Sequence, residues 1–247
     1  MPERGQETAR EVSIHRIRKR AFRRLLVFDV EGTLFANNVN LPGTSLRSTI
    51  WQGIAHKLGP DAVREEVATH GRWKRGEYRG YLDWMADTIE IHLKYGLTRP
   101  VFDAIIAEAR YNPGVAAALD ALDRSKYEPV LISGGFRALG ERVQRDFAVR
   151  HLFAACDYIF GETDALVGYN LLPCDFDGKL DFIRLMLREY QLQDNDWVFV
   201  GDGANDVAIA RQAPLSIGYR PDPELEAVVT TAISSFEELP NLLDSMA

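Results

Sequence analysis

The stretch LLVFDVEGT, residues 25–33, runs from a continuous apolar segment into a turn that carries two acidic residues. A second stretch, WVFVGDGAND at residues 197–206, repeats this design with two further acids and an amide. Short continuous apolar runs are typical of strands that are buried on both faces. Carboxylates directly after such strands suit a magnesium ion (Mg2+), which prefers hard oxygen ligands, and they suit a carboxylate nucleophile that attacks phosphorus.

The chain around these two stretches alternates short apolar runs with helical spacing. We expect further strands near residues 129–132, 158–160 and 215–217, helices near residues 115–125, 136–149, 179–190 and 204–212, and a final pair of short elements. Such alternation predicts an α/β fold, a three-layer Rossmann-like parallel sheet with helices on both faces. Ligands of these sheets bind beyond the carboxyl ends of the strands, where residues 29–33, 133–135 and 202–206 all fall.

One long segment without strands interrupts the alternation. Residues 40–110 place apolar side chains at helical spacing, as in Ile50, Ile54 and Leu58, and Gly and Pro residues separate the helical stretches. We therefore expect a small inserted all-helical cap domain over residues 40–110, and an α/β core domain built from residues 23–39 and 111–247. Residues 1–22 make up a basic N-terminal extension, either a solvated tail or an anchor for a partner.

Composition favours a globular protein over a nucleic-acid-binding, membrane-spanning or secreted one. The 247 residues carry a net charge of −7 and are 46% hydrophobic, which allows a sizeable core. The acidic body argues against a nucleic-acid partner, and no run reaches the roughly 18 apolar residues that a membrane span needs. The N-terminus lacks the apolar core of a secretory signal, and Cys156 and Cys174 are interpreted as free buried thiols. We expect a cytoplasmic protein. Its oligomeric state is left open, with a homodimer as one possibility.

The first acidic turn could support nucleophilic catalysis. An ionised Asp29 could attack a phosphoryl group and form an aspartyl-phosphate, which splits hydrolysis into two easier steps. Glu31 lies on the same side of extended backbone, where it could protonate the leaving oxygen and then deprotonate water. Thr33 could hold the turn by a local hydrogen bond. Ordinary turn chemistry would also explain a single Asp-x-Glu.

Two further features suit an anionic ligand. Ser133 and Gly134 end a predicted strand before a helix, and glycines let backbone N–H groups approach a phosphate. Lys179 follows Asp177-Gly178 at a predicted helix start, where a cation opposes the helix dipole but would neutralise phosphate charge. A tight strand-to-helix turn and a solvated surface lysine are the simpler explanations.

The second acidic turn is the most specific local signal. Asp202, Asn205 and Asp206 lie within one short turn, and their two carboxylates would repel each other unless a cation lies between them. A divalent metal ion removes that penalty, so this turn favours a site for a divalent cation, with ordinary turn chemistry as the alternative.

Together and in this order, the four motifs resemble the haloacid dehalogenase-like superfamily. The strings LISGGF, residues 131–136, and VGDGANDVAIA, residues 200–210, are similar to its phosphoserine phosphatase-like branch, which has a helical cap. The resemblance covers residue 25 to about residue 235. It implies that Asp29 is the nucleophile, Glu31 the acid and base, and Mg2+ the cofactor. It further implies metal contacts from the Asp29 carboxylate, the Glu31 carbonyl, Asp202 and, in support, Asp206. The residues expected at the phosphate and substrate are Thr33, Ser133, Gly134, Lys179 and Asn205.

The chain departs from that pattern where the substrate would bind. Glu31 replaces the usual second Asp of the first motif. Asn38 and Met85 stand where this branch has a Glu for the substrate amino group and an Arg for its carboxylate, and neither can pair with those charges. Aromatic residues crowd the same helical stretch, most of them expected in the core and some lining a less polar pocket: Trp73, Tyr78, Tyr81 and Trp84.

The sequence thus favours a magnesium-dependent phosphomonoesterase that acts on a small phosphorylated metabolite other than phosphoserine, through an aspartyl-phosphate. Glu31 keeps a second hypothesis open, a phosphotransferase that passes the phosphoryl group to an acceptor other than water. A third hypothesis is a catalytically weak binding or scaffold protein that uses the basic extension.

Overall fold

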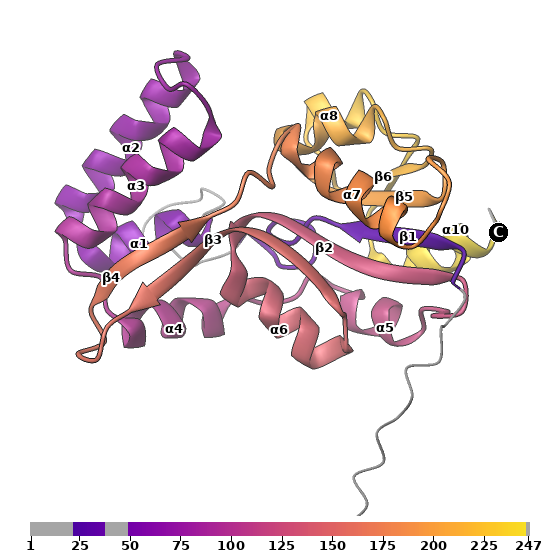
Figure 1. Ribbon diagram of the computed structural model, residues 1–247, viewed down its shortest axis with the longest axis horizontal. Coiled ribbons are helices and arrows are strands. Elements are labelled where there is room, and N and C mark those ends of the chain that lie inside the picture. The colour runs from indigo at the N-terminus through magenta and orange to yellow at the C-terminus, as the bar shows by residue number, and fades with distance from the viewer. Residues whose placement is uncertain (1–21, 38–48, 246–247) are drawn as a thin grey trace, which may run out of the picture.

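Seven strands form a single sheet in the computed structural model, which describes residues 22–37 and 49–245 (Figure 1). The strands are β1 (Arg24–Phe28), β2 (Tyr127–Phe136), β3 (His151–Phe160), β4 (Leu166–Leu171), β5 (Trp197–Gly201), β6 (Ser216–Tyr219) and β7 (Thr231–Ile233). Their order is β4-β3-β2-β1-β5-β6-β7, and every neighbouring pair is parallel except β3 and β4. The predicted α/β sheet is confirmed. The chain moves outward from β1 in both directions, so the edge beyond β1 and β5 is the place where a ligand site is expected.

Helices cover both faces of this sheet. α5 (Val115–Asp120) and α6 (Arg137–Phe147) lie on one face, while α7 (Gly178–Glu189) and α8 (Val207–Ala210) lie on the other (Figure 1). Short elements complete the C-terminal part: η1 (Ala204–Asp206), α9 (Pro223–Glu226), η2 (Phe236–Glu238) and α10 (Leu239–Ser245). β1 lies in the middle, and its residues 25–28 are fully buried, as the continuous apolar run requires.

Four helices fill the expected insert between β1 and β2. They are α1 (Ile50–Leu58), α2 (Pro60–Lys74), α3 (Tyr81–Lys94) and α4 (Arg99–Glu108). Thr49 forms a capping box with Gln52 at the start of α1, and Pro60 occupies the first turn of α2, where its missing N–H costs nothing. α1, α2 and α3 stand together above the part of the sheet formed by β3 and β4, whereas α4 runs beneath it (Figure 1). The Phe102 ring of α4 lies 5.3 Å from that of Phe136, so α4 packs on the sheet.

The sheet differs from the sequence prediction at one edge. β3 begins at His151, well before the strand expected near residues 158–160, and β4 was not predicted. The early residues of β3 are only partly buried, and β4 pairs antiparallel at the edge, where Val167 and Asn170 are exposed and Tyr169 is half-buried. An edge strand of this kind lacks the continuous apolar run that marks a buried one. The single helix expected over residues 204–212 is instead the 3-10 turn η1 followed by the short helix α8, which ends at Ala210.

No helix within residues 22–37 and 49–245 is both long and apolar enough to cross a membrane. The basic extension lies outside the described residues except for Phe22, and so does Asn38.

Candidate active site

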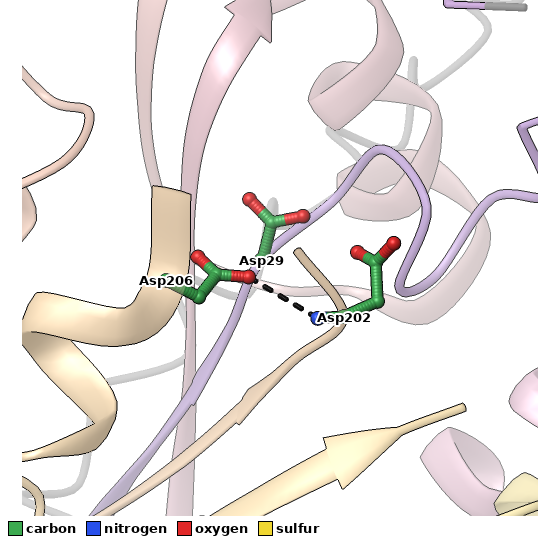
Figure 2. A group of neighbouring side chains, drawn as sticks. All are labelled: Asp29, Asp202 and Asp206. Atoms are coloured by element: carbon green, nitrogen blue, oxygen red, sulfur yellow. Dashed lines mark hydrogen bonds between the residues drawn. The ribbon is translucent and has the colours of Figure 1, made fainter. Parts of the chain in front are cut away.

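Three aspartates meet where β1 and β5 end. β1 and β5 pair in parallel with Phe28 beside Val200, so the residues that follow them emerge at the same edge of the sheet. Asp29 follows β1, and Asp202 and Asp206 come from the turn after β5 (Figure 2). One oxygen from each carboxylate lies within 4.8 Å of the others. The two acidic turns of the sequence therefore form one buried cluster.

The side chain of Lys179 reaches this cluster from the first turn of α7. Its Nζ donates to Asp29 Oδ1 at 2.7 Å and to Asp206 Oδ1 at 2.5 Å, and it lies 3.6 Å from Asp175 Oδ1. The side chain is fully buried, which rules out a solvated surface lysine. Burial alone would lower the pKa of Lys179, but the charges of Asp206 and Asp29 outweigh it and raise the pKa well above its usual value. Lys179 is a fixed cation at the bottom of the site.

The turn after β5 is organised by Asp206. Its Oδ2 accepts from the backbone N–H groups of Asp202 at 3.1 Å and Gly203 at 3.4 Å, while its other oxygen accepts from Lys179. Figure 2 marks the bond from the Asp202 N–H. Asp206 is fully buried and its oxygens are already engaged, so it holds the turn in place and presents Asp202.

The loop after β1 closes against Asp202. Thr33 Oγ1 donates to Asp202 Oδ1 at 2.8 Å, so Thr33 contacts the acidic turn directly. Gly32 has φ +93°, and a Cβ added to it would lie 2.2 Å from Asp202 Oδ2, so this close approach requires glycine. Asn112 donates to the Gly32 and Thr33 carbonyls at 2.9 and 2.7 Å. Nothing in the sequence pattern marked Asn112, because it meets this loop only where the chain returns to the sheet.

The donor set fits a hard divalent cation. The site holds the carboxylates of Asp29, Asp202, Asp206 and, nearby, Asp175, against the ammonium of Lys179. Burial raises the pKa of Asp29 well above its usual value although Lys179 lowers it, and burial with the charge of Asp206 raises the pKa of Asp202 to about 7. Buried negative charge in excess of positive charge, offered through oxygen atoms, matches what Mg2+ requires.

Glu31 joins the core to the inserted helices. Its Oε1 accepts from the backbone N–H of Ile50 at 2.5 Å, and Ile50 is the first residue of α1. Burial raises the pKa of Glu31 to about 7, although the bond from Ile50 lowers it. A carboxyl group with such a pKa exists in both protonation states near neutral pH, as an acid that later acts as a base must.

Ser133 and Gly134 line the site beside Asp175. Ser133 is buried near the end of β2, and its Oγ accepts from the Gly135 N–H at 3.0 Å. The Gly134 carbonyl accepts a hydrogen bond from the hydroxyl of Tyr81 in α3. A Cβ on Gly134 would lie 2.1 Å from Asp175 Oδ2, so this close approach requires a glycine. Ser133 and Gly134 thus line the same cavity as the acidic cluster.

Asp175 is a site residue that sequence reasoning missed. It is nearly buried, and it accepts from Asn205 Nδ2 at 2.9 Å, which ties the turn after β5 to the loop before α7. Burial raises its pKa although Lys179 lowers it. No sequence signal marked Asp175, because it lies in the loop before α7 and meets Lys179 only through the fold of that loop.

A cavity of about 740 Å³ opens between these core residues and α1, α2 and α3. The core contributes Asp29, Glu31, Ser133, Gly134, Asp175, Asp202 and Asn205 to its lining, together with neighbouring residues. Thr33, Lys179 and Asp206 lie behind this surface, outside the lining. Met85, at the position compared with a substrate-binding Arg, is buried and lines the cavity. The structure thus brings all nine predicted site residues together at one edge of the sheet.

Known proteins match this chain along most of its length. A family model described as haloacid dehalogenase-like hydrolase matches residues 23–214. The phosphoserine phosphatase of Lactococcus lactis is 26% identical over 213 residues, which are 83% of this chain and 88% of that protein. Phosphoserine phosphatases of Streptomyces coelicolor and Mycobacterium tuberculosis are 28% and 26% identical, over 87% and 86% of this chain. This chain spans 48% of the length of each of those two.

Solved structures share the fold. A phospho-aspartyl intermediate analogue of phosphoserine phosphatase superposes with a TM-score of 0.69 at 17% identity, covering 90% of this chain and 99% of that one. A phosphoserine phosphatase in apo form gives a TM-score of 0.68 at 19% identity, with 90% and 98% covered. Both agree with an α/β sheet that carries a helical insert after its first strand.

Proposed function

This chain belongs to the haloacid dehalogenase-like hydrolase family, in its phosphoserine phosphatase-like part, and we propose that it is a magnesium-dependent phosphomonoesterase. The substrate would be a small phosphorylated metabolite, hydrolysed through an aspartyl-phosphate on Asp29. The observation that carries this proposal is the buried cluster of Asp29, Asp202 and Asp206 around Lys179, at the inner end of a cavity.

Asp29 is the proposed nucleophile. Its carboxylate faces the cavity, and Lys179 holds one of its oxygens. Attack on phosphorus forms the bond from Asp29 to phosphorus and breaks the bond to the ester oxygen, which takes a proton from Glu31. Glu31 then accepts a proton from the water that attacks the aspartyl-phosphate, so free phosphate leaves and Asp29 is restored. The pKa of Glu31, raised to about 7, supports both roles.

A cation, hydrogen-bond donors and a metal ion would together compensate the negative charge of the phosphoryl group. Lys179 supplies a fixed positive charge at Asp29, and Ser133 and the Gly134 backbone line the cavity, where they could donate hydrogen bonds to the phosphoryl oxygens. The Asp29 and Asp202 carboxylates and the Glu31 carbonyl would hold Mg2+, with Asp206 in support. The ion supplies further charge compensation for the phosphoryl oxygens.

Residues 40–110 are proposed as the cap domain and residues 23–39 with 111–247 as the core. α1, α2 and α3 contribute one side of the cavity, and the bond from Ile50 to Glu31 ties the cap to the catalytic loop. α4 packs on the sheet and would anchor the cap.

A substrate other than phosphoserine is part of the proposal. Several relatives carry the name phosphoserine phosphatase. Met85, however, offers the cavity an apolar side chain and no charge for a carboxylate.

The test is phosphate release from a panel of phosphomonoesters, phosphoserine included, with and without Mg2+. We expect release that requires Mg2+ and is selective for an ester without an amino-acid carboxylate. Selective hydrolysis of phosphoserine would overturn the substrate proposal. Release that needs an added alcohol acceptor would favour the phosphotransferase, and no turnover under any condition would favour the binding protein.

A further inference from the structure

The far side of the cavity is built by two helical stripes. Side chains three to four residues apart on α2 line it, from Val63 through Glu66 and His70 to Trp73. The matching stripe of α3 runs from Tyr81 through Trp84, Met85 and Thr88. Each stripe is the inward face of its helix, so these side chains meet whatever group extends outward from the phosphate.

Four aromatic rings on this side form what we call the aromatic box: Trp73, Tyr81, Trp84 and Phe176. Trp73 and Trp84 stack with ring centroids 4.9 Å apart and an interplanar angle of 11°. Phe176 packs against Trp73 and Tyr81 with centroids 5.6 and 5.3 Å away. Phe176 follows Asp175 in the loop before α7, and the Tyr81 hydroxyl bonds Gly134. The box is therefore next to the proposed phosphate site.

Glu66 is a carboxylate without a partner among the residues that the structure describes. It lines the cavity, and burial raises its pKa to about 7. Its chain neighbour Glu65, on the outer face of α2, instead accepts from Lys94 at 2.6 Å and from Tyr95 at 2.8 Å. A half-buried carboxylate that lacks such partners pays part of the desolvation cost of a buried charge, which a cation from a ligand would remove.

The charged side chains that line the cavity, among residues 22–37 and 49–245, all have one sign. Its described lining includes five carboxylates, and it includes no Lys or Arg: Asp29, Glu31, Glu66, Asp175 and Asp202. Lys179 lies behind the surface at the phosphate end. A carboxylate on the outward part of a substrate would meet Glu66 with no Lys or Arg of the described lining to pair with, whereas a positive charge there would be attracted.

We propose that the aromatic box and Glu66 bind the cationic leaving group of a phosphorylated alkylated amino alcohol. This substrate class rests on the proposed function for the position of the phosphate at Asp29. A positively charged nitrogen that carries alkyl groups attracts the faces of Trp and Tyr rings, and its carbon atoms bury apolar surface. Glu66 supplies the opposite charge, and the alkyl groups need none of the hydrogen-bond acceptors that a primary ammonium would need.

The test compares two esters of the same shape. 2-(Trimethylammonio)ethyl phosphate and 3,3-dimethylbutyl phosphate differ only in the charge of the quaternary centre. We expect kcat/KM to favour the charged ester by about tenfold or more, from attraction to the rings and to Glu66. Glu66→Gln, which keeps the shape of the side chain, should reduce that ratio severalfold.

The matched control is Glu90→Gln, which removes the same charge from an exposed position on α3 outside the cavity. It should leave the ratio unchanged. Equal kcat/KM for the two esters, or a ratio unaffected by Glu66→Gln, would overturn the inference while leaving the hydrolase intact.

A binding measurement separates this inference from the proposed function. If no ester is hydrolysed, the hydrolase proposal fails, and calorimetry of the two parent alcohols then tests the cavity alone. Tighter binding of (2-hydroxyethyl)trimethylammonium than of 3,3-dimethylbutanol, lost in Glu66→Gln, would still support the inference. Binding of the cation no tighter than that of the neutral alcohol would overturn it.

Discussion

At the scale of single residues, the described part of the site holds more buried carboxylates than cations to compensate them. Lys179 compensates part of a buried set of carboxylates, and the acidic side chains that remain have raised pKa values because they are poorly solvated. A buried ion pair contributes to stability only when its hydrogen bonds and charges are balanced. In the proposed enzyme a bound cation and a substrate would complete this balance, so the proposed catalytic residues are costly to the free protein.

This imbalance predicts how stability responds to Mg2+ and pH. The pKa of Asp202 is raised in the folded protein to about 7, above its unfolded value of about 3.9. A raised carboxyl pKa stabilises the metal-free fold below the unfolded value, and that contribution is lost as pH rises through the folded one. Mg2+ must displace those protons, so the increase in Tm that it causes should be larger at pH 8 than at pH 5.

Thermal unfolding with and without Mg2+ at the two pH values measures this difference. At a hundredfold excess over Kd, the ion should stabilise the fold by about 2.7 kcal/mol. Asp202→Asn is the control, and it should remove most of the shift at pH 8. The same shift at both pH values, or one that survives Asp202→Asn, would contradict the assignment of the metal site.

At the scale of elements, α7 positions Lys179 through the packing of its first turn. Asp177 precedes the helix, and Gly178 is its first residue. A Cβ added to Gly178 would lie 1.9 Å from the Pro173 carbonyl oxygen, a backbone atom that cannot move aside on its own. The start of α7 is therefore fixed against the preceding loop, and Lys179 with it.

Gly178→Ala should consequently destabilise the fold by about 1–3 kcal/mol and lower kcat, because the clash moves the helix start that carries Lys179. Chemical denaturation and steady-state kinetics measure the two effects. Gly80→Ala is the matched control: Gly80 is extended, and an added Cβ would meet no atom within 4 Å. Equal behaviour of the two variants would show that the contact with Pro173 does not position α7.

Elements differed in how far the sequence could predict them. β1 and β5 were predicted closely, because a strand buried on both faces must be apolar throughout. β4 was missed, because a half-exposed edge strand has no continuous apolar run and its pairing depends on β3. α2 was not separated from its neighbours, and its inward stripe mixes Glu66 and His70 with apolar residues, which conceals the helical period.

At the scale of the whole molecule, the strand order brings the predicted motifs together. β1 lies between β2 and β5, so the turns that follow these three strands share one edge. The sequence therefore predicted the core of the site from Asp29, Ser133 and Asp202. It could not predict Asp175 or Tyr81 as partners, because their contacts depend on how the loop before α7 and the cap fold over that edge.

The two cysteines report on the integrity of this fold. Cys156 and Cys174 are free and fully buried, as predicted, and burial raises the pKa of Cys174 to about 12. Thiolate is the reactive form, so both should react with a disulfide reagent far more slowly in the native protein than in guanidinium chloride. Following absorbance after reagent addition measures both rates. Native thiols that react as fast as denatured ones would contradict the buried positions.

The central claim is that Asp29 is the nucleophile of a magnesium-dependent phosphomonoesterase. The most direct measurement is phosphate release by the wild-type protein and by Asp29→Asn, side by side with saturating Mg2+, on the ester that the wild type hydrolyses best. We predict that Asp29→Asn lowers kcat by at least about a thousandfold, with circular dichroism unchanged, because an amide cannot form the covalent intermediate. Turnover by Asp29→Asn near the wild-type rate would contradict the account.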